Sequence, residues 1–124
     1  MSAGDLVTAF CGEWAKANPD TIAGYFTEDA VYHNIPMEPV VGRDAIRTFV
    51  AGFVAAFGSI DFDVRLQVVN GDVVMNERVD VFSLGGKEVR LPVVGVFEIR
   101  GDRIAAWRDY FDMAPIAELS ARSE

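Results

Sequence analysis

Which side chains form the interior of this protein depends on the orientation of one stretch, Asn76-Glu77-Arg78-Val79-Asp80-Val81-Phe82. Its alternating apolar residues predict a half-buried strand, in which successive side chains point to opposite faces. Ionic groups on a buried face are costly unless they are paired. Phe82 favours burial of the face that it shares with Arg78 and Asp80, whereas Val79 and Val81 favour burial of the opposite face. The stretch alone leaves its inside face undecided.

Four strand-like runs surround and include this stretch. They cover residues 60–69, 73–84, 88–99 and 103–111, and the segments Asn70-Gly71-Asp72, Gly85-Gly86 and Gly101-Asp102 separate them. Each separating segment is typical of a hairpin turn. The four runs therefore predict an antiparallel meander that has to curve, because helices cover only one of its faces.

The part of the chain before the meander is mainly helical. Apolar spacing predicts helices at residues 5–18, from 19 to about 26, and 43–57, with Asn18-Pro19 ending the first and starting the second. Residues 29–35 predict a strand with Tyr32 and Asn34 on one face. A short closing helix or tail follows Met113. Helices that precede a long sheet predict an α+β fold with an enclosed cavity between its layers.

Composition limits the possible functions. The 124 residues suit a single domain, residues 1–124, and a hydrophobic fraction of 51% excludes a disordered chain. A net charge of -8 argues against nucleic acid or an anionic membrane as partner. One Cys and one His exclude an internal disulfide and a Cys/His metal site. The chain shows neither signal-peptide features nor an apolar run of roughly 20 residues, so we expect a cytoplasmic protein.

The last strand helps to assign the inside of the sheet. Alternation places Trp107, Asp109 and Phe111 on one face, and two large aromatic side chains favour burial of that face. A buried Asp109 needs a cationic partner, which Arg78 can supply. This pairing favours the interpretation in which the Arg78/Asp80 face also points inward.

Such a cluster would contain two carboxylates and one guanidinium. The planar fork of Arg78 can bind Asp80 and Asp109 together, and the surplus negative charge favours a proton on one carboxyl group. A general acid would then lie beside a general base, and Tyr32 with Asn34 would add two groups able to hold a water. A buried ion network that only fixes the strand register is the alternative.

These residues also carry a family resemblance. The segments Tyr32-His33-Asn34-Ile35-Pro36, Gly42-Arg43-Asp44-Ala45, Glu77-Arg78-Val79-Asp80-Val81, Gly95-Val96-Phe97 and Trp107-Arg108-Asp109-Tyr110-Phe111-Asp112 resemble the limonene-1,2-epoxide hydrolase family. This family is part of the NTF2-like (SnoaL-like) superfamily. The resemblance extends from the first helix to about Asp112 and implies a cone-shaped α+β fold.

The resemblance implies a role for each of five residues. Asp109 matches the general base, Asp80 the general acid and Arg78 the bridging arginine, while Tyr32 and Asn34 match the pair that holds the nucleophilic water. The implied reaction is a one-step attack of water on an epoxide that needs no cofactor and gives a vicinal diol. The family also implies a homodimer formed through the outer sheet face, where alternation places Val79, Val81 and Tyr110.

The expected pocket is apolar, which suits a hydrophobic, cyclic, terpenoid-like epoxide. The predicted lining residues are Phe53, Phe57, Phe82, Leu91, Val93 and Phe111. Some of these are bulkier than the family pattern, so the resemblance does not extend to limonene itself as substrate. Two alternatives remain: a ketosteroid-isomerase-like or polyketide-cyclase-like enzyme, which needs no arginine between carboxylates, and a non-catalytic module that binds small hydrophobic ligands.

Overall fold

The structure is a computed structural model that describes residues 1–122, with side chains to residue 118. Residues 123 and 124, which the predicted domain includes, lie outside the described residues. The elements in chain order are α1 (Ala3–Glu13), α2 (Pro19–Ala23), β1 (Phe26–Asn34), β2 (Val40–Val41), α3 (Arg43–Phe57), β3 (Asp61–Asn70), β4 (Val73–Leu84), β5 (Lys87–Arg100), β6 (Arg103–Tyr110) and α4 (Ala114–Arg122). Within this described part, no helix is both long and apolar enough to cross a membrane.

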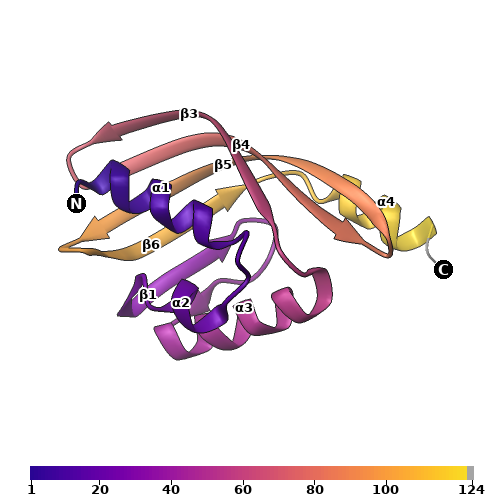
Figure 1. Ribbon diagram of the computed structural model, residues 1–124, viewed down its shortest axis with the longest axis horizontal. Coiled ribbons are helices and arrows are strands. Elements are labelled where there is room, and N and C mark those ends of the chain that lie inside the picture. The colour runs from indigo at the N-terminus through magenta and orange to yellow at the C-terminus, as the bar shows by residue number, and fades with distance from the viewer. Residues whose placement is uncertain (123–124) are drawn as a thin grey trace.

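The six strands form one curved sheet in the order β2-β1-β6-β5-β4-β3. Strands β3 to β6 are joined by hairpins and pair antiparallel, which confirms the predicted meander. Strand β1 adds to β6 in parallel orientation, so the sheet is mixed. Figure 1 shows the long strands running side by side over the helices.

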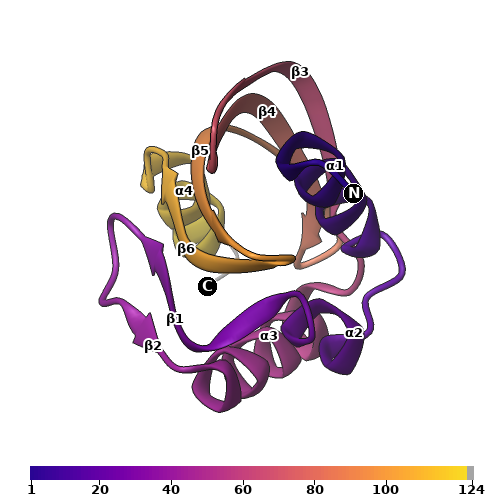
Figure 2. The same cartoon turned by 90° about the vertical axis from the view of Figure 1, so that its left-hand side faces the viewer.

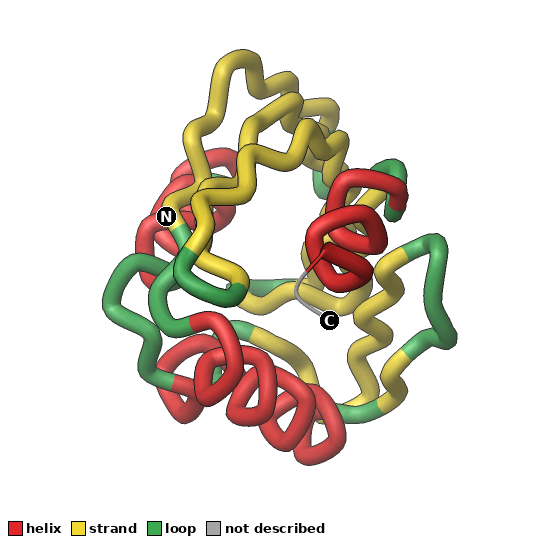
Figure 3. The backbone as a smooth tube through the Cα atoms, turned by 90° about the vertical axis from the view of Figure 1, so that its right-hand side faces the viewer, coloured by secondary structure: helices red, strands yellow, loops and turns green. Residues whose placement is uncertain are grey.

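Helices α1, α2 and α3 lie on the concave side of the sheet. Viewed from the end, the sheet curls so that α1 faces it from one side and α3 lies below it (Figure 2). Figure 1 places α4 at the other end of the long strands, and Figure 3 shows the molecule from that end. Aromatic rings fill the space between the layers, with Phe10, Trp14, Phe26, Phe97 and Trp107 all buried. This arrangement confirms the predicted α+β cone.

The first two helices and the first strands differ in extent from the prediction. Helix α1 ends at Glu13, because the following residues form turns and Ala17 adopts a left-handed φ of 56°. Asn18 caps α2 as predicted, and Pro19 is its first residue. Strand β2 was not predicted; it is a two-residue edge strand that follows a proline-containing loop and pairs with Val31 and Tyr32.

Strand β4 settles the question of orientation. Asn76, Arg78, Asp80 and Phe82 are all buried, whereas Val79 and Val81 are only half-buried and Glu77 is exposed. The Arg78/Asp80 face therefore points toward the interior.

Candidate active site

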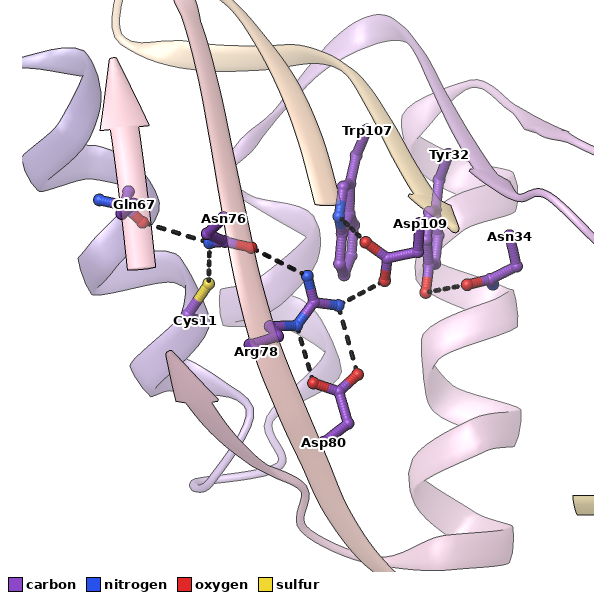
Figure 4. Close-up of polar contacts among 9 residues, drawn as sticks. All are labelled: Cys11, Tyr32, Asn34, Gln67, Asn76, Arg78, Asp80, Trp107 and Asp109. Atoms are coloured by element: carbon purple, nitrogen blue, oxygen red, sulfur yellow. Dashed lines mark hydrogen bonds and ion pairs between the residues drawn. The ribbon is translucent and has the colours of Figure 1, made fainter. Parts of the chain in front are cut away.

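Arg78 joins two buried carboxylates (Figure 4). Its Nε donates to Asp80 Oδ1 at 2.7 Å, and its Nη2 donates to Asp80 Oδ2 at 3.2 Å and to Asp109 Oδ2 at 2.5 Å. Arg78 and Asp80 lie two residues apart on β4, so they share a face, while Asp109 reaches the guanidinium from β6. The predicted cluster of one guanidinium and two carboxylates is thus assembled from two strands.

The sheet leaves room for this bridge at Gly95, on the intervening strand β5. A Cβ atom at this position would lie 2.5 Å from Arg78 Nη1 and 2.9 Å from Asp109 Oδ1. A glycine inside a strand is typical of such a close approach. The ring of Phe62 covers the guanidinium, with its centroid 4.4 Å from Cζ, and keeps water from that face.

The two carboxyl groups have different surroundings. Asp109 Oδ1 accepts a hydrogen bond from Trp107 Nε1 at 2.7 Å, so each oxygen of Asp109 has a protein donor. Among the side chains that the structure describes, Arg78 alone donates hydrogen bonds to Asp80, which lies at the wall of the cavity. Burial raises the pKa of Asp80 from 3.8 to about 6, against the opposing effect of Arg78. Burial also raises the pKa of Asp109, while Arg78 and Trp107 act against it.

Strand β1 brings Tyr32 and Asn34 to the same place. In the parallel register with β6, Asn34 lies opposite Asp109 and Tyr32 lies opposite Trp107. The Tyr32 ring stacks on Trp107 with centroids 4.2 Å apart, and its hydroxyl donates to Asn34 Oδ1 at 3.3 Å. Burial raises the pKa of Tyr32, so its hydroxyl stays neutral. All five residues matched to the family pattern therefore lie around one point.

An apolar cavity of about 540 Å³ opens beside this cluster. Asp80, Asp109, Tyr32 and Asn34 are at its wall, and Arg78 lies behind them. The structure also places all six predicted lining residues there: Phe53, Phe57, Phe82, Leu91, Val93 and Phe111. What each of these residues does in a reaction stays a prediction.

Several further residues at this site were not identified from the sequence. Trp14, Phe62, Met113 and Ile116 also line the cavity, and Asn76 contacts Arg78. Trp107 could have been predicted as a site residue, because alternation places it on the same strand face as Asp109. Among the described residues, no group of three or more His, Cys, Asp or Glu side chains is placed to hold a metal ion.

Comparison with known proteins gives a family match. Residues 7–107 match the SnoaL-like domain. The epoxide hydrolase EphG of Mycobacterium tuberculosis (strain ATCC 25618 / H37Rv) is 31% identical over 109 residues, which cover 86% of this chain and 71% of the relative.

Solved structures agree on the fold. An LEH-like epoxide hydrolase of M. tuberculosis superimposes with a TM-score of 0.84 at 28% identity, covering 98% of this chain and 90% of that one. A protein of Catenulispora acidiphila with a ketosteroid isomerase-like fold, in complex with trimethylamine, has a TM-score of 0.84 at 23% identity, covering 94% and 92%. A candidate polyketide cyclase of Xanthomonas campestris pv. campestris has a TM-score of 0.82 at 19% identity, covering 98% and 96%. The last two similarities concern the fold alone.

Proposed function

This chain belongs to the SnoaL-like family, in which it is a homologue of an epoxide hydrolase, and we propose that it is itself a cofactor-independent epoxide hydrolase. The proposed substrate is a hydrophobic, cyclic epoxide of terpenoid-like character, and the product is a vicinal diol. The observation that carries the proposal is the Arg78 bridge between two carboxyl groups at the wall of an apolar cavity.

In the proposed reaction, Asp109 is the general base and Asp80 the general acid. Asp109 takes a proton from a water as the water oxygen attacks an epoxide carbon. The carbon–oxygen bond of the ring breaks in the same step, and Asp80 gives its proton to the departing oxygen. Ring strain supplies driving force, so the main contribution of the protein is to place acid, base and water correctly. Exchange with solvent then returns the proton from Asp109 to Asp80.

The surroundings of each group support these roles. The two hydrogen bonds to Asp109 favour its charged form, and each of its oxygens keeps a second lone pair for a water. Tyr32 and Asn34 offer acceptors for the other hydrogen of that water. Asp80 has one donor group and a pKa of about 6, which suits a carboxyl group that holds a proton.

Arg78 is also the feature that separates this proposal from an isomerase or cyclase on the same fold. Those reactions need a carboxylate base and a neutral donor to an oxyanion. A permanent positive charge between the two carboxyl groups instead favours one ionised and one protonated group. A binding module without activity would need none of these groups to titrate.

A single-turnover reaction in ¹⁸O-labelled water tests the proposal. We expect the label in the diol after the first turnover, because water attacks directly. The variants Asp109→Asn, Asp80→Asn and Arg78→Ala should each lose nearly all activity on a panel of cyclic epoxides. Unlabelled diol in the first turnover would exclude direct attack by water, and tight binding of epoxides without turnover would favour a binding module.

We further propose that two copies of the chain associate through the outer face of the sheet. Val79 and Val81 are half-buried there, and Tyr110 is 46% exposed. Contiguous apolar residues on an exposed sheet face are typical of protein interfaces.

A further inference from the structure

A second polar network lies behind the Arg78 bridge, and the proposed mechanism does not use it. Asn76 is on the same face of β4 as Arg78 and is 1% exposed. Its Oδ1 accepts from Arg78 Nη1 at 3.2 Å, and its Nδ2 donates to Gln67 Oε1 at 3.2 Å and to Cys11 Sγ at 3.7 Å (Figure 4).

Gln67 connects this network to α1. Its Nε2 donates to the carbonyl oxygen of Gly4 at 3.2 Å and to Thr8 Oγ1 at 3.1 Å. The contacts therefore run without a break from the first helix, through two side-chain amides, to the guanidinium.

Each amide in this network has one favourable orientation. A guanidinium has donors only, so Asn76 has to present its oxygen to Arg78. Its nitrogen then faces Gln67, which has to present its own oxygen and turn its nitrogen toward α1. Burial raises the pKa of the Cys11 thiol to about 12, so the sulfur that contacts Asn76 is neutral.

A β-bulge in β3 brings Gln67 to this position. Val64 pairs with Arg78, but the next pairs along β4 are Leu66 with Glu77 and Gln67 with Asn76, which leaves Arg65 as the extra residue. In a regular strand, Leu66 would lie opposite Asn76. The bulge thus replaces an aliphatic side chain with an amide at the one place where Asn76 needs an acceptor.

We propose that Asn76 is a positioning residue: it holds the Arg78 guanidinium in the orientation that bridges Asp80 and Asp109, and Gln67 holds Asn76. The carboxyl groups contact Nε and Nη2, whereas Asn76 contacts Nη1 on the opposite side of the fork. This third contact opposes rotation of the guanidinium away from Asp109. The inference rests on the proposed epoxide hydrolase function.

Replacement of Asn76 tests this role. Asn76→Leu removes the acceptor, and we expect kcat to fall on the order of 10²-fold with little change in KM, because the acid and base are misplaced. Asn76→Asp has nearly the same shape but gives Arg78 a third carboxylate. It should move the kcat/KM profile to higher pH, because each of Asp80 and Asp109 then holds its proton more tightly. Unchanged kcat in the first variant and an unchanged profile in the second would refute the proposal.

Gln67 should act only through Asn76. Gln67→Met keeps the length of the side chain and should lower kcat less than Asn76→Leu does. The double variant Asn76→Leu/Gln67→Met should be no less active than Asn76→Leu alone. Once Asn76 is replaced, Gln67 no longer has an amide to hold in place. Losses that add up in the double variant would contradict this order of action.

A measurement without substrate separates this inference from the proposed function. In ¹⁵N NMR spectra, the two Nη groups of Arg78 should give separate signals in the wild type and merged signals in Asn76→Leu. Asn18→Ala is the matched control, since it removes the cap of α2 and should leave these signals and kcat unchanged. Merged signals in a protein that hydrolyses no epoxide would refute only the function; separate signals in an Asn76→Leu variant with normal turnover would refute only the positioning role.

Discussion

Arg78 supplies one positive charge to two buried carboxyl groups, so Asp80 and Asp109 titrate as a pair. The proposed reaction needs a proton on Asp80 and none on Asp109. Because the pKa of Asp80 is about 6, kcat/KM should fall as the pH rises through about 6. The raised pKa of Asp109 should move the acidic limb of the profile above the ordinary titration range of an aspartate. Initial rates between pH 4 and 9 measure both limbs, and a rate that increases steadily above pH 7 would contradict the assignment.

The same shift has a consequence for stability. The pKa of Asp80 is higher in the folded chain than the ordinary value of 3.8, so the folded state binds the proton more tightly. Protonated Asp80 therefore contributes on the order of 3 kcal/mol to the free energy of unfolding. This contribution is fully present below pH 4 and is lost as the pH rises through about 6. Urea unfolding of the wild type and of Asp80→Asn at several pH values checks this. The variant should lack this decrease in the free energy of unfolding.

Gly95 should tolerate no side chain. In Gly95→Ala the added carbon would meet Arg78 Nη1 and Asp109 Oδ1, so the bridge has to open or the strands have to separate. We expect a loss of about 1–3 kcal/mol of stability, as for other overpacked sites, together with most of the activity. Gly12→Ala is the control, because its Cβ would meet no atom of the described residues within 4 Å and alanine favours the helix α1. Thermal unfolding should therefore show a lower Tm for Gly95→Ala and an equal or higher Tm for Gly12→Ala. Epoxide turnover should be mostly lost in Gly95→Ala and kept in Gly12→Ala.

At the scale of elements, helix α3 forms one wall of the cavity. Phe49, Phe53 and Phe57 recur at every fourth residue, so they form a stripe along the helix, and all three line the cavity. Phe53 contacts Phe57 and Phe82, and Phe82 follows the proposed acid, Asp80, by two residues on β4. The size of these rings should limit the size of the substrate.

Phe53→Leu tests this limit. The smaller side chain should increase kcat/KM for bulky cyclic epoxides relative to small ones, at a cost of about 1–2 kcal/mol in stability. The ratio of kcat/KM for the two classes of epoxide is the measurement. Ala55→Ser, at an exposed position of the same helix, should leave the ratio unchanged. If Phe53→Leu had the same ratio as the wild type, Phe53 would not determine the size of the substrate.

The elements also show how far sequence reasoning reaches. Alternation and turn residues were enough to predict β3 to β6, because hairpin neighbours are close in sequence. They could not predict that β1 would join β6 in parallel, and this long-range pairing is what brings Asn34 opposite Asp109. The bulge at Arg65 was equally hidden, since no local pattern marks it. The role of Asn76 depends on that bulge and so was missed, although Arg78, Asp80 and Asp109 were found from spacing and charge.

At the scale of the molecule, the sheet has one face on the cavity and one face with exposed apolar side chains. Two cross-strand pairs stand out on the outer face: Val68 lies opposite Met75, and Val94 lies opposite Tyr110. All four are more than a third exposed. Their burial would be favourable, which supports the proposed association of two copies through this face.

The proposed dimer predicts a specific effect of charge on this face. Val68→Lys combined with Met75→Lys places two positive charges on neighbouring strands, where the partner would have to bury them. We expect sedimentation at micromolar concentrations to give a dimer for the wild type and a monomer for the double variant. Val41→Lys is the control and should leave the dimer intact, because Val41 is 63% exposed but lies on β2, the edge strand opposite to β3. A double variant that still sediments as a dimer would place the contact elsewhere. Since all residues of the proposed acid–base cluster come from one chain, the monomeric variant should keep its hydrolase activity, whereas a loss of turnover on dissociation would mean that the partner supports the site.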